Sequence, residues 1–213
     1  MNEGLLNKIK SVGLSYQEYY NLTKKEIETA DPNKFTDDEK KRHEDKKLNL
    51  HRMTRIEKHY SISEELKNLI LQVDKPQTWM IISETWCGDS AQNIPFISKM
   101  AETNSNINIK IILRDSNPDI MDLYLTNGTR SIPILVAFDE SGKELLRWGP
   151  RPQEAKQLVN DLIAQGVEKS IRAEKLHLWY GRNRGRSLEI EMFKAIRNAL
   201  LSDSQCEFYH NKM

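Results

Sequence analysis

The chain has 213 residues, and its 32 basic and 31 acidic residues leave a net charge of +1. This near-neutral charge provides no global field that would attract nucleic acid or an anionic membrane. The first ten residues lack the apolar run of a secretory signal, and no later stretch approaches the roughly 18 apolar residues of a membrane span. We therefore expect a cytoplasmic protein with one domain, additions at both ends, and neither nucleic-acid nor membrane partners.

Residues 1–75 are rich in Lys, Glu and Asn and predict a helical N-terminal extension. Two capping boxes, at 15–18 and 36–39, mark helix starts, because each places a Glu three residues after a Ser or Thr. Asp31-Pro32 separates these helices, and a third is expected to begin near Ser63. The sequence does not say whether the extension covers the site described below.

Residues 76–166 predict an α/β domain, because short apolar runs alternate with helical spacing. The expected elements are strands at 79–82 and 107–113 around a helix, a short helix after 117–118, a strand at 134–138, a turn at 139–142, a strand at 145–148 and a helix ending at Gly166. This order is β-α-β-α-β-β-α, and the first two strands should be parallel with a right-handed crossover.

Residues 167–213 are expected to form a C-terminal loop and an amphipathic helix that packs on the same domain. The loop is the Gly- and Arg-rich segment 182–186, and Ser187 is the expected helix cap. Cys206 follows the amphipathic face and is expected to be a spare thiol.

The most informative motif is Trp86-Cys-Gly-Asp-Ser90, which is followed by Ser131-Ile132-Pro133. Cys87 lies where a strand passes into a helix, and the positive end of a helix dipole favours a thiolate. We therefore expect a nucleophile with a lowered pKa. Ser90 lies one turn on and could donate to the thiolate, whereas the charge of Asp89 opposes it. Trp86 would form a flat rim for a partner.

These residues and the element order resemble the thioredoxin superfamily, in particular a bacterial group with an added N-terminal helical region. Segments 114–119, 124–128, 130–133 and 148–152 carry the likeness to that group. The resemblance implies a thioredoxin-like fold, with a central mixed sheet flanked by helices. It also implies a nucleophile at Cys87, a cis proline at Pro133, and an Ile132 backbone that pairs with an extended peptide. Gly149 would match a glycine that lets substrate backbone approach.

Two departures from the superfamily affect the same half of the reaction cycle. Ser90 stands where a dithiol enzyme has its resolving cysteine, and Ile81 stands where thioredoxins keep a buried aspartate. Cys87 would therefore attack a thiol- or disulfide-bearing protein or small molecule and depend on an external thiol for release. Such a protein could act as a thiol–disulfide oxidoreductase or in isomerase-like fashion. The alternative is a redox-inactive thioredoxin-fold module that binds a protein or peptide.

Other candidate ligands follow from charge and spacing. If Arg130 and Arg151 flank Cys87, their guanidinium groups could hold a carboxylate-bearing thiol such as glutathione or bacillithiol. Arg114 with Asp115 is better explained as an ion pair. An iron–sulfur cluster of the monothiol glutaredoxin kind is disfavoured, because that family's glycine pair is absent. The scattered histidines do not form a metal motif, and we expect no cofactor.

Overall fold

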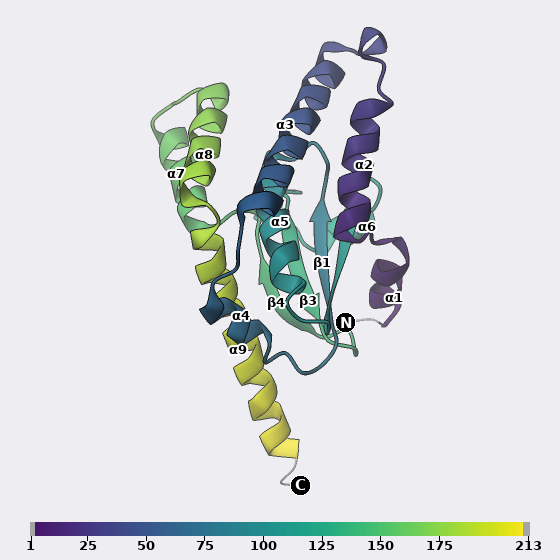
Figure 1. Ribbon diagram of the computed structural model, residues 1–213, viewed down its shortest axis with the longest axis vertical. Coiled ribbons are helices and arrows are strands. Elements are labelled where there is room, and N and C mark those ends of the chain that lie inside the picture. The colour runs from purple at the N-terminus through teal and green to yellow at the C-terminus, as the bar shows by residue number, and fades with distance from the viewer. Residues whose placement is uncertain (1–2, 211–213) are drawn as a thin grey trace.

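The computed structural model describes residues 3–210, with the side chains of residues 4–202. A four-stranded sheet lies at its centre, with helices on both faces (Figure 1). The elements are α1 (Glu3–Val12), α2 (Tyr16–Glu28), the short 3-10 helix η1 (Pro32–Lys34), α3 (Asp37–His59), α4 (Glu64–Ile70), β1 (Gln77–Ser83), α5 (Gly88–Ala101), β2 (Ile107–Leu113), α6 (Pro118–Asp122), β3 (Ile134–Phe138), β4 (Glu144–Trp148), α7 (Gln153–Ala164), α8 (Lys169–Asn183) and α9 (Arg186–His210).

The sheet has the strand order β2-β1-β3-β4. Strand β1 pairs with β2 in parallel and with β3 in antiparallel orientation, and β3 pairs with β4 in antiparallel orientation. The predicted order β-α-β-α-β-β-α is thus confirmed. The fold is the mixed α/β fold expected of a thioredoxin-like domain.

Side chains alternate between the two faces of the sheet along each strand, and both faces are covered by helices. On one face, Trp79 and Ile81 of β1 lie in a core that also contains residues of α3, α4, α5 and α9. On the other face, Met80 and Ile82 lie in a second core with residues of α1 and α6. Helix α5 therefore begins above a fully packed sheet, which fixes the position of its first turn.

The N-terminal extension folds as part of the domain. Both predicted capping boxes are formed, at Ser15 and at Thr36. Tyr19 of α2 and Met53 of α3 are 1% exposed and share one core with Trp79 of β1. The extension and the sheet thus bury a continuous apolar interior.

The C-terminal region departs from the prediction. Residues 169–183, expected to belong to a loop, form α8, whose Leu176 and Tyr180 pack with Ala155 of α7. The expected loop 182–186 is consequently reduced to residues 184–185, and Ser187 lies in the first turn of α9 instead of capping it. Cys206 belongs to the helical backbone of α9, and its side chain lies outside those described.

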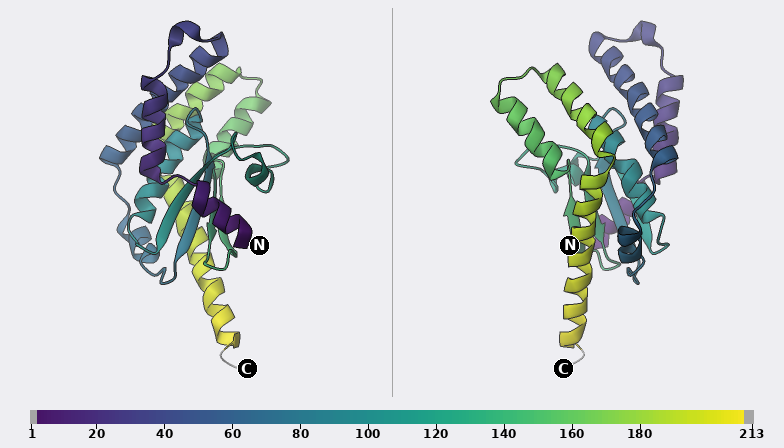
Figure 2. Two further views of the ribbon diagram at one scale, coloured as in Figure 1. Left: turned by 90° about the vertical axis from the view of Figure 1, so that its right-hand side faces the viewer. Right: turned by 60° about the vertical axis from the view of Figure 1, so that its left-hand side comes forward.

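Two helical hairpins extend beyond the same end of the sheet. Figure 1 shows β1 directed toward the end at which the α2–α3 pair and the α7–α8 pair both project, and Figure 2 shows the same arrangement from other sides. The carboxyl end of β1, where the cysteine motif begins, therefore lies between them. None of the helices described here is long and apolar enough to cross a bilayer.

Candidate functional site around Cys87

Cys87 is the last residue of the short connection, residues 84–87, between β1 and α5. It is the N-cap residue of α5, with extended backbone angles, and only 8% of its surface is exposed. The thiol donates a hydrogen bond to the carbonyl oxygen of Ile132 at 3.5 Å. The sulfur thus lies at the helix start, as predicted, but in its protonated form it is turned toward a neighbouring loop.

The predicted low pKa of Cys87 is wrong for this arrangement. The pKa of the thiol is raised from 9.0 to about 11, in the first place by burial and in the second by the negative charge of Asp89. The Ser90 hydroxyl and the first amides of α5 lower the pKa, as predicted, but they do not outweigh burial. While the thiol is protonated, the buried Ser90 hydroxyl has no hydrogen-bond partner among the described residues, and it can donate to the sulfur once the thiolate forms.

The Ile132–Pro133 peptide is cis and lies directly opposite the cysteine. Gly149 lies behind it with a positive φ of 124°, and a Cβ atom there would lie 2.2 Å from the carbonyl oxygen of Pro133. Glycine is therefore required by the close approach of the chain's own backbone. This glycine lets β4 end against the Pro133 loop; that Gly149 also admits substrate backbone stays a prediction.

Asp89 anchors a buried polar network at the start of α5. Its Oδ2 accepts hydrogen bonds from Arg151 at 2.7 and 2.8 Å, and its Oδ1 accepts one from the Tyr180 hydroxyl at 2.8 Å. Asn93 donates to the same hydroxyl oxygen at 3.1 Å. Arg151 is therefore already paired with a carboxylate, and the network ties α8 to Asp89, two residues after the cysteine.

His177 of α8 and Arg52 of α3 cover the same helix start from two sides. A Cβ atom at Gly88 would lie 2.8 Å from His177 Cε1 and 3.3 Å from an Arg52 guanidinium nitrogen. The pKa of His177 is lowered from 6.5 to about 4, in the first place by burial and in the second by the charge of Arg52. His177 is thus neutral at pH 7, and its Nδ1 has no partner among the described residues.

The N-terminal helices hold the segment that precedes the cysteine, which answers whether they reach the site. Tyr19 donates to the Glu84 carbonyl at 2.9 Å, Asn49 donates to the Thr85 carbonyl at 3.1 Å, and Thr85 donates to Glu26 at 2.6 Å. The first two bonds satisfy backbone carbonyls that belong to neither strand nor helix. Helices α2 and α3 therefore hold the segment before the cysteine, and α3 also contributes Asp45 to the lining of the cleft.

Trp86 contacts two cations. The guanidinium carbons of Arg42 and Arg114 lie 5.5 and 4.8 Å from its ring centroids. The ring is half-buried and borders the cysteine cleft, in agreement with the predicted rim. The two cation–π contacts help to fix its orientation.

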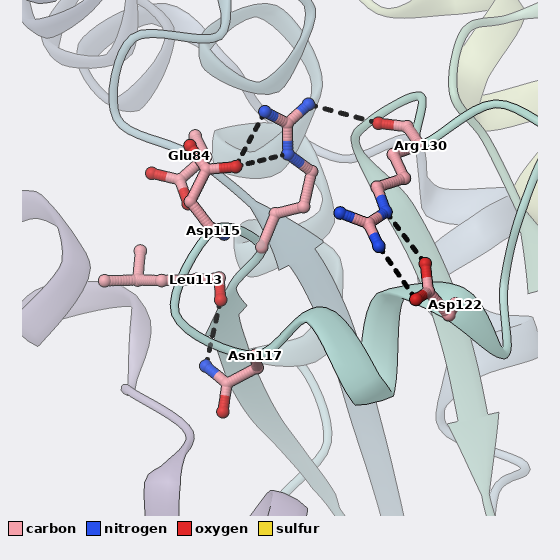
Figure 3. Close-up of polar contacts among 7 residues, drawn as sticks. Glu84, Leu113, Asp115, Asn117, Asp122 and Arg130 are labelled. Atoms are coloured by element: carbon pink, nitrogen blue, oxygen red, sulfur yellow. Dashed lines mark hydrogen bonds and ion pairs between the residues drawn. The ribbon is translucent and has the colours of Figure 1, made fainter.

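The remaining arginines of the cleft are paired within the chain (Figure 3). Arg130 forms a two-bond ion pair with Asp122, both bonds being 2.8 Å. Arg114 pairs with Asp115 at 2.7 Å, as expected, and also donates to the Arg130 carbonyl. Because Arg130 and Arg151 both have carboxylate partners, they are not a ready site for the carboxylate of a small thiol.

Cys87 borders an open cleft of about 570 Å³ that also contains Trp86, Arg130, Ile132 and Arg151. The predicted site residues are thus brought together, apart from Ser90, Pro133 and Gly149, which do not line the cleft. Ile81 is fully buried and apolar beneath α5, so it provides no proton-transferring group. Within residues 4–202, no group of three His, Cys, Asp or Glu side chains could hold a metal ion.

Tyr180, His177, Arg52 and Asn93 were missed by reasoning from the sequence. The available signal was Leu176, Trp179 and Tyr180 at helical spacing, which would have predicted α8. No sequence rule places the polar groups of that helix against Asp89, since the contact spans 91 residues.

Residues 35–166 match the sequence model of a thioredoxin family. The match begins before α3 and ends after α7, and with the observed sheet it assigns the fold. The chain therefore belongs to the thioredoxin family. Among curated proteins, none matches the chain.

Solved structures extend the fold comparison. An HIV epitope scaffold is 14% identical over 90% of this chain and 96% of its own, with a TM-score of 0.57. A Pseudomonas aeruginosa protein of unknown function is 16% identical over 87% of this chain and 99% of its own, with a TM-score of 0.54. A domain of alkylhydroperoxide reductase AhpF from Enterococcus faecalis is 20% identical over 46% of this chain and 47% of its own, with a TM-score of 0.37. The first two show that the fold extends beyond the central domain.

Proposed function

We propose that this protein is a monothiol thioredoxin-like protein that exchanges disulfides through Cys87. The observation that carries the proposal is Cys87 at the start of α5, opposite the cis Ile132–Pro133 peptide, in a cleft of about 570 Å³. Ser90 occupies the position one turn on, where a second sulfur would be needed to complete the exchange within the chain.

The proposed reaction begins with attack by the Cys87 thiolate on one sulfur of a partner disulfide. The partner's S–S bond breaks, a mixed disulfide with Cys87 forms, and the departing thiolate takes up the proton that Cys87 lost. Ser90 has no sulfur with which to displace the partner. An external thiol then attacks the mixed disulfide, restores the Cys87 thiol and forms a new disulfide with the partner.

The raised pKa of Cys87 limits this reaction. With a pKa of about 11, only about one molecule in ten thousand carries the thiolate at pH 7. Exchange with dilute disulfides is therefore expected to be slow. A partner whose extended backbone pairs with Ile132 would hold its disulfide beside the sulfur and raise the effective concentration.

The same buried thiol favours a second candidate, a binding module without turnover. In that case the Ile132–Pro133 edge would bind an extended peptide, and the Cys87 thiol would only donate its hydrogen bond to Ile132. Cys87 would then be a small buried side chain, and its replacement by serine would leave binding unchanged.

The two functions are separated with a peptide that carries a disulfide to a chromophoric thiol. In a Cys206→Ala background, exchange predicts release of the chromophore and a covalent peptide adduct that persists until an external thiol is added. The matched control is the Cys87→Ser, Cys206→Ala chain, which should give neither. Equal peptide binding by both chains without chromophore release would contradict exchange and support the binding module.

A further inference from the structure

A second cavity, of about 700 Å³, lies between α3, α5, α8 and the start of α9. It shares no lining residue with the Cys87 cleft. Its walls include the aromatic rings of Tyr60 and Phe96, which meet edge to face with centroids 4.6 Å apart. The cavity is therefore a distinct feature of the fold that disulfide exchange does not use.

Basic side chains outnumber acidic ones in the lining of this cavity. Arg55, Arg184 and Arg186 are all exposed and line it, together with His59. In the described part of the chain, none of the three arginines forms an ion pair, unlike Arg114, Arg130 and Arg151 of the other cleft. Three unpaired guanidinium groups around one cavity produce a local positive field in a chain whose net charge is +1.

The acidic residue of the lining does not neutralise these cations. Glu189 Oε1 accepts hydrogen bonds from the Tyr60 hydroxyl and from the Ser63 amide. Its carboxylate therefore holds the end of α3 against α9 and forms no ion pair with the three arginines. One carboxylate against three guanidinium groups leaves the lining with a net positive charge that can attract an anion.

The arginines are positioned by close packing. A Cβ atom at Gly185 would lie 2.6 Å from the Phe96 ring, and Gly185 has a positive φ of 85°. Only glycine lets the α8–α9 connection lie this close to Phe96, and Arg184 and Arg186 flank that contact. Arg186 also begins α9, whose positive dipole end adds to the attraction for an anion.

We propose that this cavity binds a small polyanion with two or more phosphate or carboxylate groups. Guanidinium groups from α3 and from the α8–α9 connection would each bind one anionic group in a forked geometry. A cavity of about 700 Å³ is larger than a single phosphate needs and lies in the range of small-molecule sites. A partly open pocket between helices, in a chain without a global positive field, fits a small molecule better than a nucleic acid.

The test titrates the full chain with tripolyphosphate and, separately, with citrate at constant ionic strength by isothermal titration calorimetry. The test variant is Arg184→Asn with Arg186→Gln, since asparagine tolerates the left-handed backbone of residue 184. A second variant is Arg55→Gln, on the opposite wall. The matched control is Arg182→Gln, which removes an exposed arginine of the same segment outside the cavity.

We expect saturable binding of at least one probe, weakened about tenfold or more by either test variant and less than about twofold by Arg182→Gln. Tripolyphosphate alone would identify a phosphorylated ligand, citrate alone a polycarboxylate, and both a general oxyanion site. Absence of binding to both probes, or equal weakening by Arg182→Gln, would overturn the proposal. Tighter binding of a single-stranded oligonucleotide that the test variants weaken would also overturn it, in favour of nucleic acid. Circular dichroism confirms that each variant is folded.

Discussion

Replacing Asp89 with asparagine should make Cys87 more reactive. The carboxylate of Asp89 is the second cause of the raised Cys87 pKa, after burial. Asparagine has the same size; its one oxygen can accept from Arg151, and its NH2 group can donate to the Tyr180 hydroxyl oxygen in place of the bond that Tyr180 now donates. Burial of the thiol therefore changes little while the repulsion disappears. Arg151 would then be an uncompensated cation beside the thiol, which also favours the thiolate.

The expected change in the reaction rate follows from the expected change in the Cys87 pKa. Loss of one adjacent charge should lower the Cys87 pKa by about one unit, which is about 1.4 kcal/mol. At a pH below the Cys87 pKa of both the parent and the Asp89→Asn chain, this lower pKa increases the thiolate fraction about tenfold. Because a less basic thiolate is a weaker nucleophile, with a Brønsted coefficient of about 0.4–0.5, the net rate should rise about threefold.

The assay follows alkylation of Cys87 by iodoacetamide from about pH 6 to pH 10.5 by intact mass, in a Cys206→Ala background. A control, Asp119→Asn, removes a carboxylate whose exposed side chain pairs with Lys8, and should leave the rate unchanged. An Asp89→Asn rate equal to or below that of the parent would refute the assigned charge effect. A parent midpoint below about 8.5 would refute the role of burial.

Four further outcomes test other contacts. Ser90→Cys should let the chain form an internal disulfide with Cys87 and discharge the peptide adduct without external thiol; a persistent adduct in mass spectra would show that the two sulfurs do not meet. Gly149→Ala should lower the free energy of unfolding in urea by about 3 kcal/mol or more, because its Cβ would overlap a carbonyl oxygen, and an unchanged midpoint would contradict that packing. His177 has its pKa lowered from 6.5 to about 4, so the unfolded chain binds more protons between these values and wild-type stability falls as pH drops through that window. Between these pH values the wild-type chain should lose at most about 3 kcal/mol more free energy of unfolding than His177→Gln. Equal pH dependence of the free energy of unfolding in the two chains, measured in urea, would exclude this effect. Tyr19→Phe removes a buried hydroxyl donor and should lower stability by about 1–2 kcal/mol in the same urea assay, whereas no change would show that the bond contributes nothing.

The sequence predicted those parts of the fold that depend on local patterns. Capping residues such as Ser15 and Thr36 act within one helical turn, and the short apolar runs of the strands alternate or fill a buried sheet. The position of Cys87 at the start of α5 follows from the same local rules. These features could be read without knowing which elements are neighbours.

The electrostatic state of the site could not be predicted in this way. The helix dipole at Cys87 is a local effect and favours the thiolate, but burial depends on how Ile132 and the helices pack around the sulfur. Likewise, the partners of Arg130 and Arg151 are carboxylates, and in the case of Arg151 the partner is 62 residues away. Long-range packing therefore changed the sign of the expected pKa shift.

The bonds from α2 and α3 to residues 84 and 85 also bear on how the protein can be divided. The match to the thioredoxin family begins at residue 35, which suggests a natural place to trim the chain. Trimming there would remove Tyr19 and Glu26, and with them two of the contacts that hold the segment before Cys87. A minimal fragment chosen by family boundaries alone would thus keep the cysteine and lose part of the framework that positions it, so studies of its chemistry require the whole chain.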